Sequence, residues 1–239
     1  MSSKMYDIAL SVFFPCYNEE LNLQGLVFEA IQILSHSVQK HEIMIINDGS
    51  TDKTGLVADR LSMEHEHVRV IHHNKNRGYG AALVSGFSNA VHEWIFFTDG
   101  DRQFFISEIE LLLNEIDEHD VIIGYRETRR DPLYRILYGY AWTRLVQLLF
   151  GLNVKDTNCA FKLFKKKILD SVTLHSSGAM INTELLVKFQ SLGARMKQVG
   201  VSHRPRTFGN PTGGNPKVIL KAFIELLELR KELARHRLS

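Results

Sequence analysis

Two acidic residues one position apart are the strongest candidates for chemistry in the sequence. Asp99-Gly100-Asp101 follows the apolar run Trp94–Thr98, and Gln103 comes two residues later. If the run is a strand, carboxylate and amide oxygens lie at its carboxyl end. Such hard ligands suit Mg²⁺ or Mn²⁺, which could neutralise a diphosphate leaving group. An isolated Asp-Gly-Asp is more often a turn that merely ends a strand, so the other polar segments must decide.

Three further polar segments follow other apolar runs. Residues 15–20 (PCYNEE) form one such polar loop. Residues 47–52 (NDGSTD) could contact a nucleotide, because a buried Asp48 can accept a hydrogen bond from a base. Residues 74–80 (NKNRGYG) place two cations and two glycines before a helix start, which could cradle phosphate. Each segment alone also fits an ordinary turn before a capped helix. The dinucleotide fingerprint is incomplete and a Walker A motif is absent, which disfavours a dehydrogenase and excludes a P-loop hydrolase.

The apolar pattern supplies elements that could position these segments. Apolar runs at 8–14, 42–46, 68–71, 94–98 and 121–124 alternate with helix-period stretches at 19–38, 51–61, 78–91 and 106–116. This alternation predicts a mostly parallel α/β sheet, which binds ligands outside the carboxyl ends of its strands. Beyond residue 124 we expect a basic, aromatic helical stretch at 125–151, an apolar run at 160–164, a helix at 182–192, a strand at 196–201, a mobile loop at 206–216 and a closing helix at 217–237.

Composition narrows the class of protein. The chain has 239 residues, 44% of them hydrophobic and only 5 of them Pro, which excludes disorder. Its formal net charge of +2 argues against a nucleic-acid partner. Cys16 and Cys159 have no CxxC spacing, so we expect no disulfide framework and a reducing, cytoplasmic compartment. No apolar run approaches the roughly 18 residues of a spanning helix, so we expect a chain that does not cross a membrane.

Taken together, the motifs resemble those of glycosyltransferase family 2. They are Pro15-x-Tyr17-Asn18-Glu19-Glu20, Asn47-Asp48-Gly49-Ser50-x-Asp52, Asn76-x-Gly78-x-Gly80-Ala81, Asp99-x-Asp101-x-Gln103 and Asp156-x-x-Cys159-Ala160-Phe161-Lys162, in that order. Among the branches of this family, the polyprenyl- and dolichyl-phosphate sugar synthases are the most similar. The family often has Asp-Asp at 47–48 and a small residue at 16, where this chain departs from it.

The resemblance implies a GT-A fold, a nucleotide-diphosphate sugar donor, a divalent metal (Mg²⁺ or Mn²⁺) and inversion at the anomeric carbon. We expect one domain over residues 1–239, with a nucleotide-sugar-binding half at 1–124 and an acceptor-binding and closing half at 125–239. The resemblance places Asp156 near the sugar. The donor-binding residues that we expect are Pro15, Tyr17, Asn18, Glu19, Asp48, Gly78, Asp99 and Arg206; the metal ligands are Asp99, Asp101 and Gln103; the catalytic residues are Asp101, Asp156 and Arg126.

The acceptor is the harder question. The stretch at 124–150 carries the arginines and aromatic residues Arg126, Arg129, Arg130, Arg135, Tyr125, Tyr134, Tyr138, Tyr140 and Trp142. Arginine matches phosphate geometry, and amphipathic aromatics suit the lipid headgroup region. The resembled branch has its arginine-rich acceptor loop here, so we expect Arg126, Arg129, Arg130 and Arg135 to bind an acceptor phosphate. The alternative is an exposed helix with an aromatic core stripe.

Two late segments have alternatives of the same kind. Residues 203–214 resemble a basic loop that closes over the donor, with Arg204 and Arg206 on the diphosphate, but also fit a plain surface loop. The helix at 217–237 could pack on the domain or lie on anionic lipid.

Glu184 could be a catalytic base or a core or capping residue. A hydroxyl acceptor needs such a base, whereas a lipid monophosphate is already ionised near neutral pH.

We therefore expect inverting, metal-dependent transfer of a sugar from GDP-mannose or a UDP-hexose to a polyprenyl or dolichyl monophosphate. The protein would be cytoplasmic and peripherally associated with the cytosolic face of a membrane, directly or through a separate membrane-anchoring protein. One alternative is a family 2 enzyme acting on a hydroxyl acceptor in polysaccharide or glycolipid synthesis, with Glu184 or Asp156 as the base. The other is a non-catalytic scaffold that binds a nucleotide sugar or a membrane partner.

Overall fold

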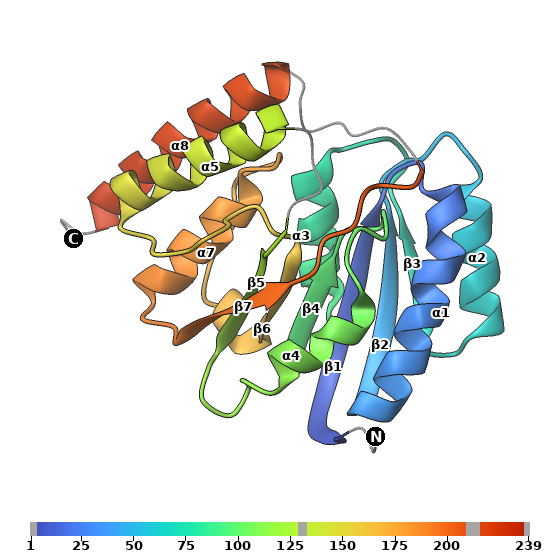
Figure 1. Ribbon diagram of the computed structural model, residues 1–239. Coiled ribbons are helices and arrows are strands. Elements are labelled where there is room, and N and C mark those ends of the chain that lie inside the picture. The colour runs from blue at the N-terminus through green and yellow to red at the C-terminus, as the bar shows by residue number, and fades with distance from the viewer. Residues whose placement is uncertain (1–3, 129–132, 209–215, 237–239) are drawn as a thin grey trace.

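The computed structural model describes residues 4–128, 133–208 and 216–236, and within them the strands form one seven-stranded sheet. The strand order is β3-β2-β1-β4-β6-β5-β7 (Figure 1). The strands are β1 (Tyr6–Cys16), β2 (Val38–Asn47), β3 (Val68–His72), β4 (Trp94–Thr98), β5 (Val121–Arg126), β6 (Phe161–Lys165) and β7 (Met196–Val201). All neighbouring strands pair in parallel except β6, which is antiparallel to β4 and β5. The predicted mostly parallel α/β sheet is confirmed.

Helices cover both faces of the sheet (Figure 1). Helices α1 (Glu20–Ser37), α2 (Thr54–Glu64) and α4 (Ile109–Leu113) lie on one face, and α3 (Tyr79–Asn89) and α7 (Ile181–Ser191) lie on the other. On the second face, Phe164 of β6 packs against both helices. Its ring centroid lies 5.8 Å from that of Phe87 on α3 and 5.1 Å from that of Phe189 on α7. The central strands are continuous apolar runs because both of their faces are buried.

Two expected elements differ in the structure. The stretch at 125–151 is not helical throughout, since β5 continues to Arg126 and helix α5 spans Leu133–Phe150. The extra strand residues pair with β7, which holds Tyr125 beside Gly200 and Arg126 beside Val201. The expected helix at 106–116 is a 3₁₀ turn (Ile106–Glu108) followed by the short α4. A helical turn, α6 (Lys166–Leu169), follows β6 directly.

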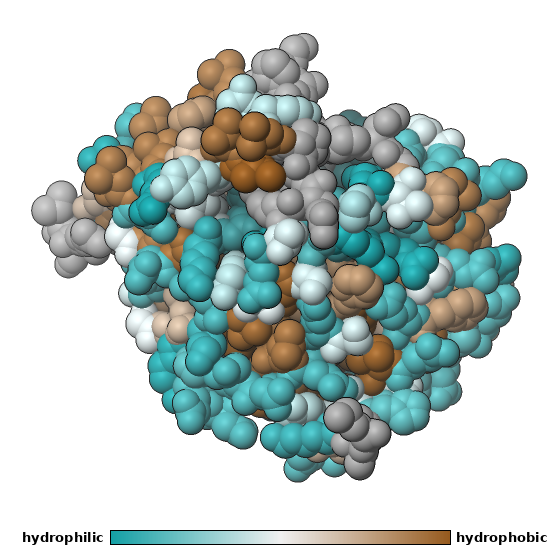
Figure 2. Space-filling model, viewed as in Figure 1, coloured by the Kyte–Doolittle hydropathy of each residue, from teal (hydrophilic) through white to brown (hydrophobic). Residues whose placement is uncertain are grey.

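Helix α8 (Pro216–His236) packs beside α5, with the rings of Trp142 and Phe223 5.5 Å apart (Figure 1). Apolar side chains gather on the outer surface of this pair, at the upper left of Figure 2. We call this surface the α5/α8 face; its exposed residues are Leu133, Tyr134, Leu137, Tyr138, Tyr140 and Leu148 from α5, and Leu220, Phe223, Ile224 and Leu227 from α8. No helix in the described parts of the chain is both long enough and apolar enough to span a bilayer. Most of the loop expected at 206–216 lies outside the described residues.

Candidate active site

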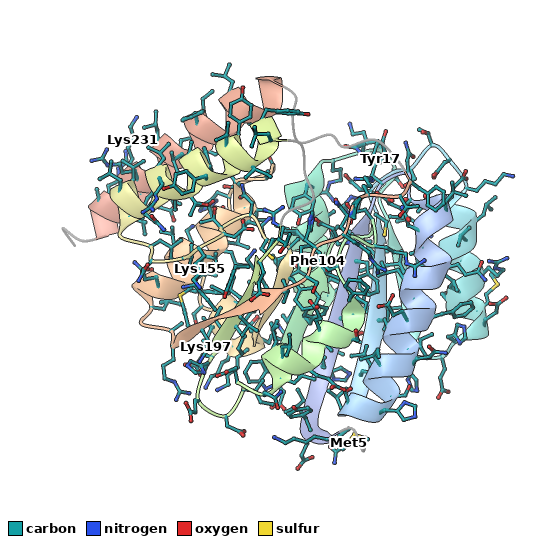
Figure 3. The ribbon with its side chains drawn as sticks, viewed as in Figure 1. Met5, Tyr17, Phe104, Lys155, Lys197 and Lys231 are labelled. Carbon is teal, nitrogen blue, oxygen red and sulfur yellow. The ribbon has the colours of Figure 1, made fainter. Side chains whose placement is uncertain are left out.

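The polar loops predicted from the sequence gather at one end of the sheet. Figure 3 shows Met5 and Tyr17 at opposite ends of β1, and the loops that follow β1, β2 and β4 lie at the Tyr17 end. The register brings these ends level, because Cys16 of β1 is paired with Asn47 of β2. This end is where open parallel sheets bind ligands. We call it the donor end.

The first two loops at the donor end are bonded to each other. The Asn18 backbone N–H donates to Ser50 Oγ at 3.0 Å, and the Thr51 N–H donates to Asn18 Oδ1 at 2.8 Å. The Glu19 N–H donates to Thr54 Oγ1 at 2.8 Å. Asn18 also adopts a positive φ of 57°, a conformation that Asn tolerates better than most residues. Asn18, expected to bind the nucleotide, thus has its side-chain oxygen engaged in joining the two loops.

Asp48 is buried, and its carboxylate organises the loop that follows β3. Its Oδ1 accepts from His73 Nδ1 at 2.6 Å and from the Arg77 N–H at 2.9 Å, and its Oδ2 accepts from the Gly78 N–H at 2.9 Å. The Nε2 of His73 lies 2.8 Å from Ser85 Oγ on α3. The expected nucleotide contact therefore also holds the 73–78 loop in place. Sequence reasoning missed the role of His73, because no pattern links it to Asp48.

The glycines at 78 and 80 have a packing reason. A Cβ on Gly80 would lie 2.4 Å from the backbone carbon of Ser177, and one on Gly78 would lie 3.2 Å from the Ser177 oxygen. The Gly80 N–H donates to that oxygen at 3.1 Å. The glycine-rich segment, interpreted from the sequence as a phosphate or ribose cradle, therefore lets α3 begin against the 175–178 loop. Gly78 as a donor-binding residue stays a prediction.

The expected metal ligands follow β4. Asp99 Oδ1 is buried and lacks a hydrogen-bond partner among the described residues. Burial and the neighbouring Asp101 raise the pKa of Asp99 to about 7, while the Tyr79 hydroxyl and Lys162 lower it. A divalent cation would place positive charge beside Asp99, whose buried Oδ1 has no partner among the described residues. The amide nitrogen of Gln103 donates to the Arg204 carbonyl at 3.1 Å, so Oε1 is the atom with which Gln103 could bind a metal.

These residues fit a metal that is shared with a substrate. Among residues 4–128, 133–208 and 216–236, no three His, Cys, Asp or Glu side chains form a metal-binding group by themselves. Mg²⁺ is commonly held by one or two carboxylates together with substrate phosphates and water. Asp99, Asp101 and Gln103 provide an all-oxygen set of that kind. A diphosphate would complete it.

Arg206 reaches the same carboxylates from the far end of the chain. Its Nη1 lies 3.3 Å from Asp101 Oδ2, and its Nη2 donates to Glu19 Oε1. Burial raises the pKa of Glu19, and its bonds to Asn22 and Arg206 lower it. Arg204 does not point at these groups, because its guanidinium donates to the carbonyls of Arg102 and Phe104. Of the two arginines expected near a diphosphate, the structure brings Arg206 to the donor end and uses Arg204 to anchor the segment.

Arg126 and Asp156 form a bidentate ion pair. Arg126 Nε lies 2.7 Å from Asp156 Oδ2, and Nη2 lies 2.9 Å from Oδ1. Arg126 is near enough to Asp99 to lower the pKa of that carboxyl, so β5 brings this pair to the donor end. Arg129 and Arg130 lie outside the described residues, as does the side chain of Arg135. The expected acceptor cluster is therefore described at Arg126 alone.

Glu184 has a structural position. It is buried at the start of α7, accepts from the His175 and Ser176 N–H groups, and forms an ion pair with Lys188 at 2.8 Å. These bonds lower its pKa against the effect of burial. Of the two interpretations of Glu184, the structure gives the core or capping one. Asp156 is the remaining carboxylate that was considered as a base.

The fold and the carboxylates at the donor end define a class, that of GT-A glycosyltransferase domains. The family model described as Glycosyl transferase family 2 matches residues 11–173. The chain belongs to this family. The resemblance to family 2, carried by five ordered motifs of the sequence, is thereby confirmed.

Curated relatives and solved structures agree with this assignment. An undecaprenyl-phosphate 4-deoxy-4-formamido-L-arabinose transferase of Klebsiella pneumoniae (strain 342) is 28% identical over 204 residues, which are 84% of this chain and 61% of the relative. The protein of a second Klebsiella pneumoniae strain gives the same values. The chain thus spans about three fifths of the length of these relatives.

Similar solved structures include those of glucosyl-3-phosphoglycerate synthase from Mycobacterium tuberculosis. Its complex with Mg²⁺ and uridine diphosphate has a TM-score of 0.73 at 16% identity, covering 96% of this chain and 87% of the other. Its complex with Mn²⁺, uridine diphosphate and phosphoglyceric acid has a TM-score of 0.70 at 19% identity, covering 93% and 78%. At these identities the likeness shows the GT-A fold.

Proposed function

We propose that the protein transfers a sugar from a nucleotide-diphosphate sugar, GDP-mannose or a UDP-hexose, to a polyprenyl or dolichyl monophosphate, with inversion and with a divalent metal. The observation that carries the proposal is the juxtaposition of two charged groups at the donor end. Asp99 and Asp101 follow β4, and Arg126 ends β5, which runs in the same direction as β4 with β6 between them, so the Arg126–Asp156 pair lies at the same end of the sheet. The relative named for undecaprenyl phosphate supports the choice of acceptor.

The first group would hold the donor. Asp99, Asp101 and Gln103 would bind Mg²⁺ or Mn²⁺, which when bound supplies positive charge to the departing diphosphate. Pro15, Tyr17, Glu19 and Asp48 would line the nucleotide. Arg206, which contacts Asp101 and Glu19, would donate hydrogen bonds to the diphosphate oxygens.

The second group would hold the acceptor. The planar guanidinium of Arg126 is kept in one orientation by both oxygens of Asp156, and arginine binds phosphate with the same geometry that it uses for carboxylate. We propose that Arg129, Arg130 and Arg135 add further charge at this site. Asp156 would orient the acceptor or a sugar hydroxyl. A phosphate monoester that is already ionised needs no base for its attack.

We also propose that the α5/α8 face lies on a membrane. Its exposed aromatic and aliphatic residues form one patch over two adjacent helices (Figure 2). Arg144 and Lys231 are exposed on the same helices, and basic residues favour anionic lipid. The enzyme would then reach its lipid from the cytosolic face, with residues 1–124 binding the donor and 125–239 the acceptor. A separate anchoring protein could cover the same face.

The test is transfer by purified protein with Mg²⁺ or Mn²⁺ and a panel of nucleotide sugars. We expect product on a polyprenyl phosphate and none on hydroxyl acceptors such as saccharides. Asp101→Ala is the inactive control, with its fold checked by circular dichroism. Product on a hydroxyl acceptor alone would overturn the choice of acceptor. Failure to bind any nucleotide in the presence of metal, measured by calorimetry, would favour a non-catalytic scaffold for a membrane partner.

A double variant separates the two acceptor classes within one assay. Arg129→Ala combined with Arg135→Ala removes two cations that matter only if the acceptor carries a phosphate. We expect this variant to lose transfer to polyprenyl phosphate by roughly 10²- to 10⁴-fold, because two charge-assisted contacts are lost and each is worth roughly 1.5–3 kcal/mol. Nucleotide binding should not change. Unchanged transfer would exclude these residues from the acceptor site.

A further inference from the structure

Lys162 is a fully buried lysine at the centre of the sheet. It lies on β6, opposite Phe97 of β4 and Ile123 of β5, and its exposed fraction is 0%. Buried lysines are rare in proteins and are kept where they are paired or hydrogen-bonded. The sequence drew attention to Lys162 only as the last residue of a motif. The role proposed above for the donor and acceptor groups does not use it.

The ammonium group of Lys162 has three acceptors. Nζ donates to the carbonyl of Thr157 at 3.3 Å, to the carbonyl of Cys159, and to Asn182 Oδ1 at 3.0 Å. A charged lysine has three N–H donors and a neutral one has two, so this geometry is that of the ammonium form. Two of the acceptors belong to the turn before β6, and the third belongs to α7. Lys162 therefore joins that turn to the helix.

The turn that Lys162 holds also presents Asp156. The Asp156 carboxylate accepts from the Asn158 N–H at 3.3 Å and pairs with Arg126 on the other side. Cys159, three residues on, is bonded to the ammonium. The Lys162 ammonium thus holds the turn through the carbonyls of Thr157 and Cys159. The Asp156 carboxylate of the same turn is bonded to Arg126. Movement of the turn would move both members of the ion pair.

The same lysine lies beside the carboxylate side of the site. Lys162 is paired with Phe97, two residues before Asp99, and its ammonium is 5.6 Å from the Phe97 ring centroid. Asn182 of α7 accepts from the ammonium and so ties it to the helix. A buried positive charge therefore lies between the expected donor and acceptor groups without touching either.

We propose that Lys162 is a positioning residue for sugar transfer: its ammonium fixes the turn at residues 156–159 against α7 and thereby sets Asp156 and Arg126 relative to Asp99. The inference rests on the proposed function for the reaction that it assists. It does not depend on which acceptor receives the sugar. Loss of the Lys162 charge is therefore expected to lower kcat more than it lowers the affinity for the nucleotide.

The experiment compares two lysines of the same strand. Lys162→Met keeps most of the length of the side chain and removes its charge. Lys165→Met is the matched control, because Lys165 forms an ion pair with Asp120 at 2.8 Å and lies three residues away on β6, toward the end of the sheet opposite the donor end. The measurements are kcat, the affinity for UDP or GDP with Mn²⁺ by calorimetry, and backbone hydrogen exchange of residues 156–160.

We expect Lys162→Met to lower kcat by about 100-fold, since a displacement of roughly 1 Å in a reacting group has an effect of that size. Nucleotide affinity should be nearly unchanged, and exchange at 156–160 should accelerate. Lys165→Met should leave all three readouts at their wild-type values. If Lys162→Met fails to fold, Asn182→Ala, which removes one acceptor of the ammonium, should give the same changes in smaller degree.

The outcomes separate the inference from the proposed function. Wild-type kcat in Lys162→Met or Asn182→Ala, in an active enzyme, overturns the inference and leaves the proposed function standing. Equal loss in Lys162→Met and Lys165→Met also overturns it, because a general effect on stability would then suffice. If the wild-type chain transfers no sugar, the proposed function fails. Exchange at 156–160 then decides, and unchanged exchange in Lys162→Met counts against the inference.

Discussion

At the donor end, backbone N–H groups of one loop meet side-chain oxygens of the next, whereas on α5 and α8 aliphatic and aromatic side chains face outward. Asn18 and Glu19 of the first loop are bonded to residues of the second, and the carboxylate of Asp48 holds a third. On the α5/α8 face, by contrast, Leu148 has 83% of its surface exposed. One region is held by internal polar bonds, and the other offers apolar surface to an outside partner.

The difference shows how the proposed function divides between two regions of one domain, with a polar donor expected at one and a lipid acceptor expected at the other. Preorganised polar groups stabilise charge in a transition state without having to reorient. An exposed apolar patch gains free energy only when something covers it. The Arg126–Asp156 pair lies between the two regions, since β5 leads to α5 through residues 127–132. We expect substitutions at the donor end, at the Arg126–Asp156 pair and on the α5/α8 face to have effects of different size.

The largest effect is expected at the donor end. Asp101→Asn removes a charge from the metal site and should lower transfer on the order of 10³-fold, because a bound metal supplies several kcal/mol of transition-state stabilisation. Transfer is measured with labelled nucleotide sugar, and Mn²⁺ binding by electron paramagnetic resonance. Asp120→Asn, which breaks an ion pair with Arg195 and Lys165 far from the site, is the control. An active Asp101→Asn enzyme would mean that Asp101 does not hold the metal.

The next effect sharpens the boundary between the regions. Arg126→Gln removes the guanidinium that Asp156 orients, and we expect transfer to fall by about 100-fold, in line with the loss of a charge-assisted bidentate contact. Nucleotide affinity by calorimetry should stay at its wild-type value. A parallel loss of nucleotide affinity would place Arg126 on the donor side instead.

A smaller effect is expected on the α5/α8 face. Leu148→Glu and Ile224→Glu should each weaken binding to vesicles of anionic phospholipid by about tenfold, because each buried CH₂ contributes roughly 0.8 kcal/mol. Binding is measured by co-sedimentation. Leu56→Glu is the matched control, since Leu56 is an equally apolar and exposed residue on α2. Equal weakening by all three variants would show that this face has no special role in membrane binding.

The smallest effect concerns the sheet that carries the donor end. Glu42 accepts from Ser11 Oγ at 2.5 Å, from the Val91 N–H and from Arg69 Nε, and these bonds lower its pKa below the ordinary value of 4.5. Because the folded-state pKa is the lower one, the carboxylate stabilises the fold above pH 4.5, and this contribution is lost as the pH falls through the folded-state pKa. Glu42→Gln should cost about 1 kcal/mol at pH 7 in urea unfolding.

The control for this prediction is the same pair of proteins at acid pH. As the pH falls below 4.5 and through the folded-state pKa, the difference in unfolding free energy between wild type and Glu42→Gln should shrink, since Glu42 becomes protonated in both folded and unfolded wild-type protein. A difference that stayed constant with pH would indicate a packing effect of the amide.

Local patterns were enough to predict the sheet and the placement of the acidic pair. Asp99 and Asp101 follow a continuous run of apolar residues. Such a run is typical of a strand that is buried on both faces, so it located the acidic pair at the end of β4. The antiparallel direction of β6 was not predicted, because four apolar residues and one lysine at 160–164 carry no information about strand direction. The helix expected from Tyr125 was wrong at its start, since pairing with β7 extends β5 by residues that local propensity assigns elsewhere.

The parts of the site that depend on distant partners could not be predicted. Gly80 needs its small size because of Ser177, 97 residues later, and Asp48 needs its carboxylate for the loop at 73–78. Arg206 donates a hydrogen bond to Glu19, which lies 187 residues earlier in the sequence. For Glu184 the sequence left two interpretations open, and only the contacts with Lys188 and the 175–176 backbone distinguish them.

The position of β6 has a consequence for how the chain folds. β4 and β5 follow one another in the sequence but are not neighbours in the sheet, since β6 lies between them. A nascent chain that has been synthesised only as far as β5 therefore exposes two unpaired strand edges, which are prone to association. We expect the growing polypeptide to need protection by a chaperone until residue 165 has left the ribosome. β6, the strand that fills the gap between β4 and β5, is also the strand that carries the buried Lys162.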